Sequence, residues 1–217
     1  MSIGMILLVA LSLLILFGVL QRVLDRMALS DRQALVCIAA IFIGGWLPEL
    51  SFGLITLNLG GAVVPAVVCI YLFLRAGTNK ERIRAVISSA LTAAAIFAIT
   101  RVFPSDPLVM PMIDPMILYG IAGGMIAWLL GRSRRSAFIA GVMGVLLADV
   151  ISGVRLWLRG VNQTVRLGGA GALDAIVLAG VTGVLMCELF GELMERIQTG
   201  KARSAYEDGA IEGGSRG

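Results

Sequence analysis

Three aspartates have surroundings that point to chemistry. Asp114, Asp149 and Asp174 lie within or beside apolar runs, in PMIDPMILYG, VLLADVISG and GGAGALDAIVLAG. An ionised carboxylate inside a membrane is costly, so an acid there indicates a functional site by default. Two adjacent carboxylates cannot both ionise easily, and one can hold a proton while the other activates water. Asp149 and Asp174 are therefore the candidate catalytic residues of a hydrolase.

Two other uses of the same acids stay open. A carboxylate pair with a raised pKa can exchange a proton for a cation, as a coupled transporter of small solutes requires, although the sequence shows no convincing inverted repeat. In a non-catalytic membrane scaffold, the acids would only fix helix register by pairing with Arg155, Arg159 or Arg101. Asp149 and Arg155 lie about 120° apart around a helix, so they do not share a face closely.

The composition indicates a membrane protein. The 217 residues are 58% hydrophobic and 15% charged, with a mean hydropathy of +0.93. A bilayer core about 30 Å thick needs about 20 apolar residues per crossing. We therefore expect an all-α, polytopic transmembrane helix bundle of about seven spans. The expected spans are 3–20, 34–50, 61–75, 84–102, 109–131, 136–158 and 169–192.

The basic residues predict the orientation of these spans. Most of them follow the first, third, fifth and seventh spans, whereas four lie at the opposite side: Arg101, Arg155, Arg159 and Arg166. The positive-inside rule then places the N-terminus outside and the C-terminus inside. The first apolar stretch lacks the basic start and cleavage site of a signal peptide, so it counts as a span. We expect a prokaryotic plasma membrane protein with one transmembrane domain at 1–197 and a flexible polar cytoplasmic tail at 198–217.

No metal site or cofactor is expected. The chain has no His, and Cys37, Cys69 and Cys187 lie in apolar runs without the paired spacing of metal ligands or disulfides. The expected partners are the lipid bilayer and a substrate that is membrane-embedded or lies at the outer face. The distribution of the basic residues is explained by membrane topology, so no nucleic-acid partner is expected.

The three acids are expected at similar depth. A rise of about 1.5 Å per residue places Asp149 about 10 Å, Asp174 about 9 Å and Asp114 about 8 Å below the outer edge of the membrane. Asp149 and Asp174 belong to consecutive antiparallel spans. The sequence therefore predicts a water-filled pocket that opens outward, with these two carboxylates facing each other.

Two glycine motifs lie on the same outer side. The first is ITLNLGGAVVP, in which Asn58 is a natural N-cap and Pro65 falls in the first turns of a helix. The preceding SFGLITL is short and rich in strand formers, which favours an interfacial or re-entrant segment. The second motif is the run of glycines before Asp174. We expect both to line one mouth, with substrate-binding residues Asn58, Gly60, Gly61, Asp114, Arg155, Gly169 and Gly171.

The two motifs also carry a resemblance to a known family. Asn58-Leu59-Gly60-Gly61 with Pro65, and Gly168-Gly169-Ala170-Gly171-Ala172-Leu173-Asp174, resemble the domain-of-unknown-function family 1614 of bacterial and archaeal polytopic membrane proteins. The similarity covers roughly residues 35–195. It implies a polytopic membrane fold and brings no established activity.

A weaker likeness is to the intramembrane aspartyl proteases of the presenilin and prepilin-peptidase kind. Their catalytic acids lie on two adjacent helices, one of them in a Gly-x-Gly-Asp motif. The likeness implies that Asp149 is the first acid and Asp174 the second. The sequence departs from that pattern: two residues separate Gly171 from Asp174, Ala148 precedes Asp149 in place of Tyr, and no Pro-Ala-Leu follows the last span.

Overall fold

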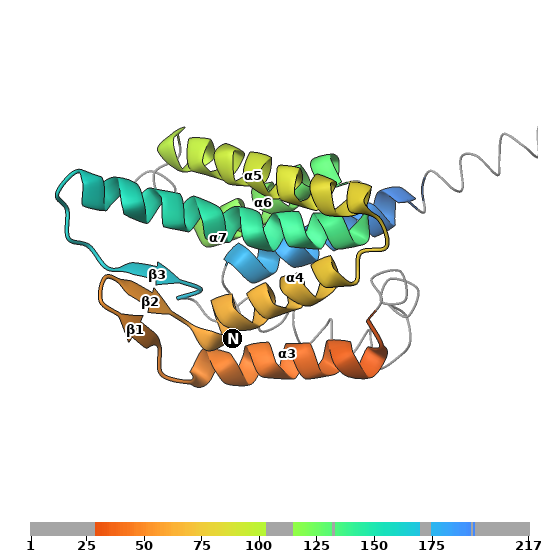
Figure 1. The fold of residues 1–217 in the computed structure, drawn as a ribbon, viewed down its shortest axis with the longest axis horizontal. Helices are drawn as coiled ribbons and strands as arrows, with labels where there is room; N and C mark the ends of the chain where they lie inside the picture. The colour runs from red at the N-terminus through yellow and green to blue at the C-terminus, as the bar shows by residue number, and fades with distance from the viewer. Residues whose placement is uncertain (1–28, 103–114, 132, 170–174, 192, 194–217) are drawn as a thin grey trace, which may run out of the picture.

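The computed structural model describes residues 29–102, 115–131, 133–169, 175–191 and 193. This part of the chain is mostly helical. Its helices run roughly along one long axis, and a small sheet lies at one end, which we call the sheet end (Figure 1). The expected first span, 3–20, and the tail, 198–217, lie outside the described residues.

The described helices pack around a C-terminal helix whose first half is buried. The bounds are α3 (Asp31–Trp46), α4 (Val64–Leu74), α5 (Asn79–Val102), α6 (Pro115–Gly131), α7 (Arg134–Leu158) and a C-terminal helix (Ala175–Gly191). The C-terminal helix, blue in Figure 1, packs against α7 at Gly141 and against α6 at Gly124. Its residues from Ala175 to Gly180 are all buried, so this stretch is enclosed on every side.

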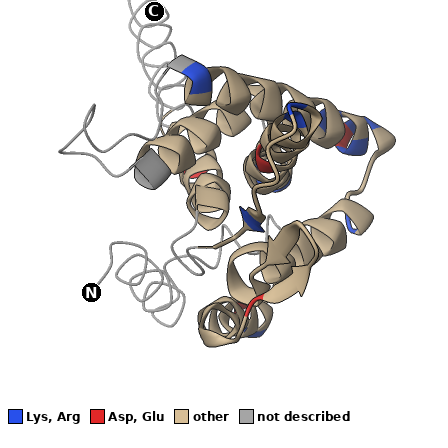
Figure 2. Ribbon diagram, turned by 90° about the vertical axis from the view of Figure 1, so that its left-hand side faces the viewer, with Lys and Arg blue, Asp and Glu red and all other residues tan. Residues whose placement is uncertain are grey.

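Two described helices are long and apolar enough to cross a membrane. They are Asn79–Arg101 and Arg134–Leu158, and shorter apolar helices cover Leu59–Leu74, Leu118–Gly131 and Ala175–Gly191. In an end-on ribbon view, most of the described helical residues are neither basic nor acidic (Figure 2).

The expected span 34–50 is displaced in the structure, where α3 covers Asp31–Trp46. Ser30 caps the helix: its side chain accepts a hydrogen bond from the Gln33 N–H, and the Gln33 side chain accepts one from the Ser30 N–H. Pro48 explains the early end, because a residue before proline is driven into extended backbone, as Leu47 is with φ −74° and ψ 152°.

The expected span 84–102 begins a full turn earlier, at Asn79. The Thr78 hydroxyl accepts a hydrogen bond from the Glu81 N–H, 3.3 Å away, which is a cap that the sequence motif Thr-x-x-Glu predicts. Hydropathy alone missed this turn because Lys80, Glu81 and Arg82 are charged.

The expectation of an all-α fold was incomplete, since the chain also forms a three-stranded sheet. Strands β1 (Leu50–Phe52) and β2 (Ile55–Leu57) make an antiparallel hairpin around Gly53, whose φ is +63°. Strand β3 (Val165–Leu167) pairs with β2 in parallel, with Ile55 opposite Val165. The segment expected to be interfacial or re-entrant is thus a hairpin, in keeping with its strand formers.

A π-helical turn, η1 (Leu59–Val63), joins β2 to α4. The N–H groups of Ala62 and Val63 both bond to the Asn58 carbonyl, 3.1 and 3.2 Å away. Pro65 lies in the first turn of α4, where its missing N–H costs little. The expected span 61–75 therefore consists of this wide turn followed by a short α-helix.

Glycines allow the helices around the C-terminal helix to approach closely. A Cβ at Gly141 of α7 would lie 2.6 Å from the carbonyl oxygen of Ala179, and one at Gly124 of α6 would lie 2.5 Å from Cβ of Thr182. A Cβ at Gly144 would meet Thr92 of α5 at 2.6 Å. These are the close contacts that small residues permit between helices in a membrane.

Ion pairs tie the connections together at the end opposite the sheet. Arg134, at the start of α7, lies 2.5 Å from Glu188 of the C-terminal helix. Glu81 of α5 accepts a hydrogen bond from the Ser133 hydroxyl and lies 3.9 Å from Arg135. The Arg135 guanidinium also donates to the Arg75 carbonyl after α4. The α4–α5 connection, the α6–α7 connection and the C-terminal helix are therefore bonded to one another at this end.

Candidate functional site

The structure brings the two glycine motifs into contact at the sheet end. The Asn58 N–H donates to the Leu167 carbonyl at 3.0 Å, which continues the parallel pairing beyond the strands. Gly168 follows with a φ of +70°, and a Cβ there would lie 2.4 Å from the Ala62 nitrogen. Backbone from residues 58–62 and from residues 167–168 thus forms one wall.

The first motif is clamped on its other side by α3. A Cβ at Gly60 would lie 2.1 Å from the Ile41 carbonyl oxygen and 2.3 Å from the Gly45 nitrogen. Backbone packs directly on backbone here, so no ligand fits between Gly60 and α3. Gly60 therefore shapes the wall by allowing this approach.

Asn58 holds the π-helical turn in place. Its side chain is only 4% exposed, and its Oδ1 accepts a hydrogen bond from the Gly61 N–H at 2.9 Å. The capping role expected from the sequence is confirmed, although the helix that it caps begins with a π turn.

Asp149 lies on a face of α7 that connects the C-terminal helix with the sheet. Val145 and Gly153 each lie about 40° from Asp149 around α7, and Gly141 lies about 80° away on the side of Val145. Gly141 packs on Ala179, whereas a Cβ at Gly153 would meet the Val165 side chain of β3 at 2.2 Å. Asp149, partly buried, lies between these two contacts.

The remaining expected site residues divide into two groups. Asp114, Gly171 and Asp174 lie outside the described residues, so the structure gives no separation between the carboxylates of Asp149 and Asp174. Gly169 is exposed beside Arg166. Arg155 is partly buried, with its guanidinium carbon 5.8 Å from the centre of the Phe97 ring, and Arg101 lies 4.4 Å above the same ring.

Tyr119 is a residue that the sequence analysis missed. It lies on α6, is partly buried, and packs against the core cluster that contains Ala175 and Ile176. Its neighbour Gly120 contacts Leu178 and Ala175. A phenol beside the start of the C-terminal helix adds a hydrogen-bonding group at this end of the bundle. Its position five residues after Asp114 in PMIDPMILYG was the available signal.

Family comparison places these features in one matched region. The model of the family described as "Protein of unknown function (DUF1614)" matches residues 47–186, which is well over half of the chain. The chain belongs to the DUF1614 family. No curated protein and no solved structure matches it. The matched region of this DUF1614 protein begins after α3 and contains the sheet, both glycine motifs and most of the C-terminal helix.

An internal repeat in the DUF1614 protein also escaped the sequence analysis. The tetrapeptide Leu-Gly-Gly-Ala occurs at 59–62 and again at 167–170. The first copy follows β2 and leads into α4. The second copy begins with the last residue of β3, and the C-terminal helix follows it in the sequence. The repeat is short, and only the pairing of β2 with β3 reveals that its two copies lie side by side (Figure 1).

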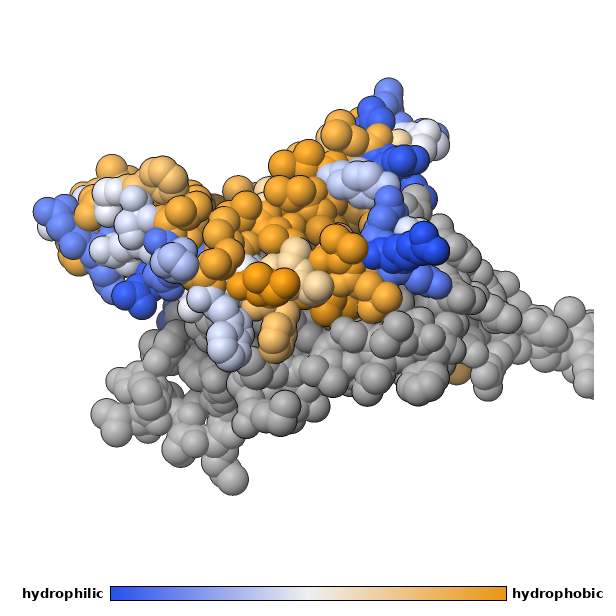
Figure 3. Space-filling view, turned by 90° about the horizontal axis from the view of Figure 1, so that it is seen from below, coloured by the Kyte–Doolittle hydropathy of each residue, from blue (hydrophilic) through white to orange (hydrophobic). Residues whose placement is uncertain are grey.

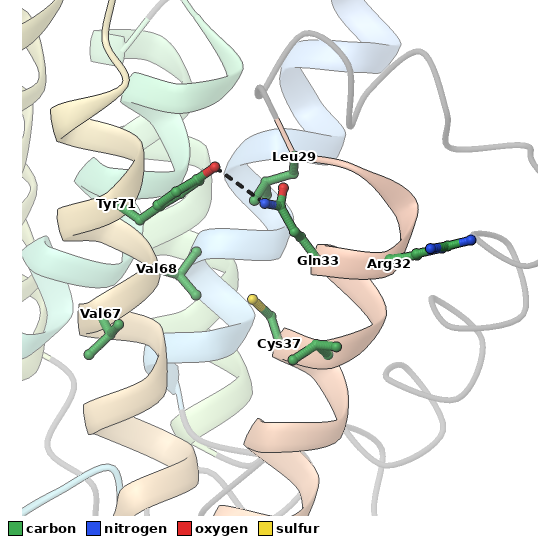
Figure 4. A pocket seen from close by; sticks show the side chains of 8 residues that line it. Leu29, Arg32, Gln33, Cys37, Val67, Val68 and Tyr71 are labelled. Atoms are coloured by element: carbon green, nitrogen blue, oxygen red, sulfur yellow. Dashed lines mark hydrogen bonds between the residues drawn. The ribbon is translucent and has the colours of Figure 1, made fainter.

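A separate cavity of about 370 Å³ lies between α3 and α4, away from the glycine motifs. Gln33 and Cys37 point from α3 toward α4, where the Gln33 amide donates to the Tyr71 hydroxyl at 3.5 Å, whereas Arg32 points away (Figure 4). The rest of the lining is apolar and includes no carboxylate. This cavity offers no acid–base pair, so the sheet end remains the candidate site.

Proposed function

We propose that this DUF1614 protein is an integral membrane hydrolase of the aspartyl type, which cleaves an extended peptide at the sheet end. Asp149 and Asp174 share the acid and base roles. The observation that carries the proposal is the position of β3, an edge strand that packs on the face of α7 bearing Asp149 and leads in sequence to Asp174.

The exposed surface supports a location in the bilayer. Large apolar side chains are exposed on several helices, including Val36 at 66%, Val67 at 57% and Ile83 at 59%. On one face of the molecule, apolar residues occupy the middle and hydrophilic residues lie toward both ends (Figure 3). Exposed apolar surface on this scale is typical of contact with lipid.

Helix register supports a carboxylate pair. Gly141 lies opposite Ala179 and Gly180, and Gly183 lies near the Ala137 carbonyl, so α7 and the C-terminal helix are antiparallel. The same register places Ala175 at the level of Val145, about 6 Å along the axis from Asp149. Asp174 directly precedes Ala175 in the sequence.

Strand β3 supports an extended peptide as the substrate. The Val165 N–H donates to the Leu54 carbonyl and the Leu167 carbonyl accepts from Asn58, so both point toward β2. Peptide groups alternate along a strand, which directs the N–H and carbonyl of Arg166 to the opposite edge. A substrate strand added at that edge would lie next to the Asp149 face of α7.

The chemistry needs only the two acids and water. The ionised carboxylate accepts a proton from water as the water oxygen attacks the peptide carbonyl carbon, and the protonated carboxyl donates its proton to the carbonyl oxygen. Collapse of the tetrahedral intermediate breaks the C–N bond, and the amine leaves with a proton returned by the acid pair. The products are a carboxylic acid that carries the water oxygen and a free amine.

Cleavage in ¹⁸O-labelled water tests this proposal. A defined set of single-span peptides is reconstituted with the purified protein in liposomes, and new C-termini that carry ¹⁸O are detected by mass spectrometry. We expect cleavage by the wild type and by Glu49→Gln, an acid in the loop before β1, and none by Asp149→Asn or Asp174→Asn. Cleavage by either Asn variant, or none by the wild type, contradicts the hydrolase.

The role of the strand edge has its own test. Arg166→Pro removes the N–H on the outer edge of β3 while leaving the groups that pair with β2. We expect at least about a tenfold loss of cleavage, whereas Arg166→Ala, which keeps the N–H, retains activity. Equal activity of the two variants would exclude strand addition at β3.

A second candidate function is coupled transport of a cation or small solute, which the Leu-Gly-Gly-Ala repeat favours. Glycine-interrupted segments at corresponding positions of two repeats are a pointer to a transporter binding site. A pH-sensitive dye inside proteoliposomes would report proton flux when a Na⁺ or K⁺ gradient is imposed. If the protein is a coupled transporter, the wild type should show proton flux, and Asp149→Asn and Asp174→Asn should each abolish it. Absence of flux in liposomes that contain the wild type would count against transport.

A further inference from the structure

A groove on α5 combines two cations with an apolar floor. It has a volume of about 390 Å³ and lies at the end of the bundle opposite the sheet. Lys80 and Arg84 lie at its polar end, followed along the same face of α5 by Ile83, Ile87 and Leu91. Leu130 of α6 forms part of the lining. Positions three and four apart lie on one helix face, so these residues form a continuous stripe.

The two cations have no carboxylate partner in the described part of the chain. The nearest acid in the sequence, Glu81, is directed to the start of α7, where it accepts from Ser133 and lies 3.9 Å from Arg135. Lys80 and Arg84 are both exposed. The groove therefore presents two positive charges to any ligand that enters it.

The length of the groove matches one leaflet of a membrane. From Lys80 to Leu91 the helix rises about 16 Å, which is about half of a hydrocarbon core about 30 Å thick. Ile83, Ile87 and Leu91 are 59%, 54% and 49% exposed. An acyl chain along these side chains would bury apolar surface that the protein itself leaves uncovered.

We propose that this groove binds an anionic glycerophospholipid. Lys80 and Arg84 hold its phosphate, and one acyl chain lies along Ile83, Ile87 and Leu91 against Leu130. Basic groups at the membrane surface beside an apolar helix face are suited to anionic lipids. The inference rests on the membrane location proposed above, and it is independent of what Asp149 and Asp174 do.

Native mass spectrometry of the detergent-solubilised protein tests the site. Phosphatidylglycerol and phosphatidylcholine are titrated separately, and bound lipid is counted. Two basic side chains near a membrane surface favour an anionic lipid by about 30-fold, so we expect Lys80→Gln with Arg84→Gln to lower phosphatidylglycerol affinity by about that factor. The matched control is Arg32→Gln with Arg75→Gln, which removes the same charge at the same end and should change affinity less than about threefold.

Two further experiments test whether the groove binds a lipid or any small anion. Ile87→Trp fills the groove and should weaken phosphatidylglycerol binding while both cations remain. Inorganic phosphate should fail to displace the lipid. Equal losses in the two double variants, displacement by phosphate, or equal binding of both lipids would overturn the lipid site. If the protein still inserts into bilayers, such a result leaves the proposed membrane location intact.

Discussion

At the scale of single residues, Gly168 combines a positive φ with close backbone contacts, so it should tolerate substitution poorly. Its φ of +70° disfavours any L side chain, and a Cβ would lie 2.5 Å from the Gly61 carbonyl carbon and 2.4 Å from the Ala62 nitrogen. Backbone atoms cannot turn aside as a flexible side chain can. One methyl group at Gly168 must therefore separate the two glycine motifs or distort them.

Gly168→Ala should lower the free energy of unfolding by about 3 kcal/mol, because left-handed backbone strain adds to a steric clash. Gly53→Ala is the matched control: Gly53 also has a positive φ, of +63°, but nothing lies within 4 Å of its added Cβ. It should cost about 1 kcal/mol. Unfolding in mixed detergent micelles, followed by circular dichroism, measures both. Equal losses would mean that the contact with Ala62 is unimportant.

At the scale of elements, the glycines that pack near the C-terminal helix differ in how much space they leave for a side chain. Gly141 would place a Cβ 2.6 Å from the backbone oxygen of Ala179, whereas the nearest atom to a Cβ at Gly123 is the Ile96 Cδ1, 3.2 Å away. The tip of an isoleucine can shift by a few tenths of an ångström, and a helix backbone cannot do so without moving the helix.

Gly141→Ala should therefore destabilise the protein by about 2 kcal/mol through displacement of the C-terminal helix. Gly123→Ala should cost less than about 1 kcal/mol, because the Ala179 Cβ at 3.3 Å need shift by only a few tenths of an ångström and alanine is the better helix former. The same unfolding measurement compares them. A Gly141 variant as stable as the Gly123 variant would show that α7 and the C-terminal helix are packed less closely than described.

Sequence patterns predicted the elements unevenly. Hydropathy located the helices, and the Asn58 cap is confirmed. The starts of α3 and α5 were missed because a capping box and a charged first turn lie outside the apolar runs. The sheet was missed because three-residue strands have too little periodicity to recognise, and pairing of β2 with β3 depends on residues far apart in the chain.

The candidate site was also predicted only in part, because its contacts join residues that are far apart in the chain. The sequence placed both glycine motifs at one end, and the structure shows their contact through Asn58 and Gly168. The sequence could not predict that the backbone of α3 occupies the space beside Gly60, because such contacts depend on how the helices pack. The separation of Asp149 from Asp174 stays a prediction, since Asp174 lies outside the described residues.

At the scale of the whole molecule, the alternating helices imply opposite exposure of the two ends. With native cysteines replaced by alanine, Asn162→Cys and Gly77→Cys each place one thiol at an exposed position, at the sheet end and at the opposite end. The orientation predicted from the basic residues places the sheet end outside. A membrane-impermeant maleimide should then label Asn162→Cys in intact cells and Gly77→Cys only after permeabilisation. Labelling of both, or the reverse order, would refute this topology.

The parallel pairing of β2 with β3 also has a consequence for biosynthesis. Leu57 leaves the ribosome long before its partner Leu167, and at about 5–20 residues per second the hairpin waits several seconds with one edge unpaired. The wall around Asn58 can close only after Leu167 and Gly168 have been synthesised. A nascent chain that stops before Gly168 therefore lacks the contact between the two glycine motifs, and the sheet end takes its final form only after both motifs have been synthesised.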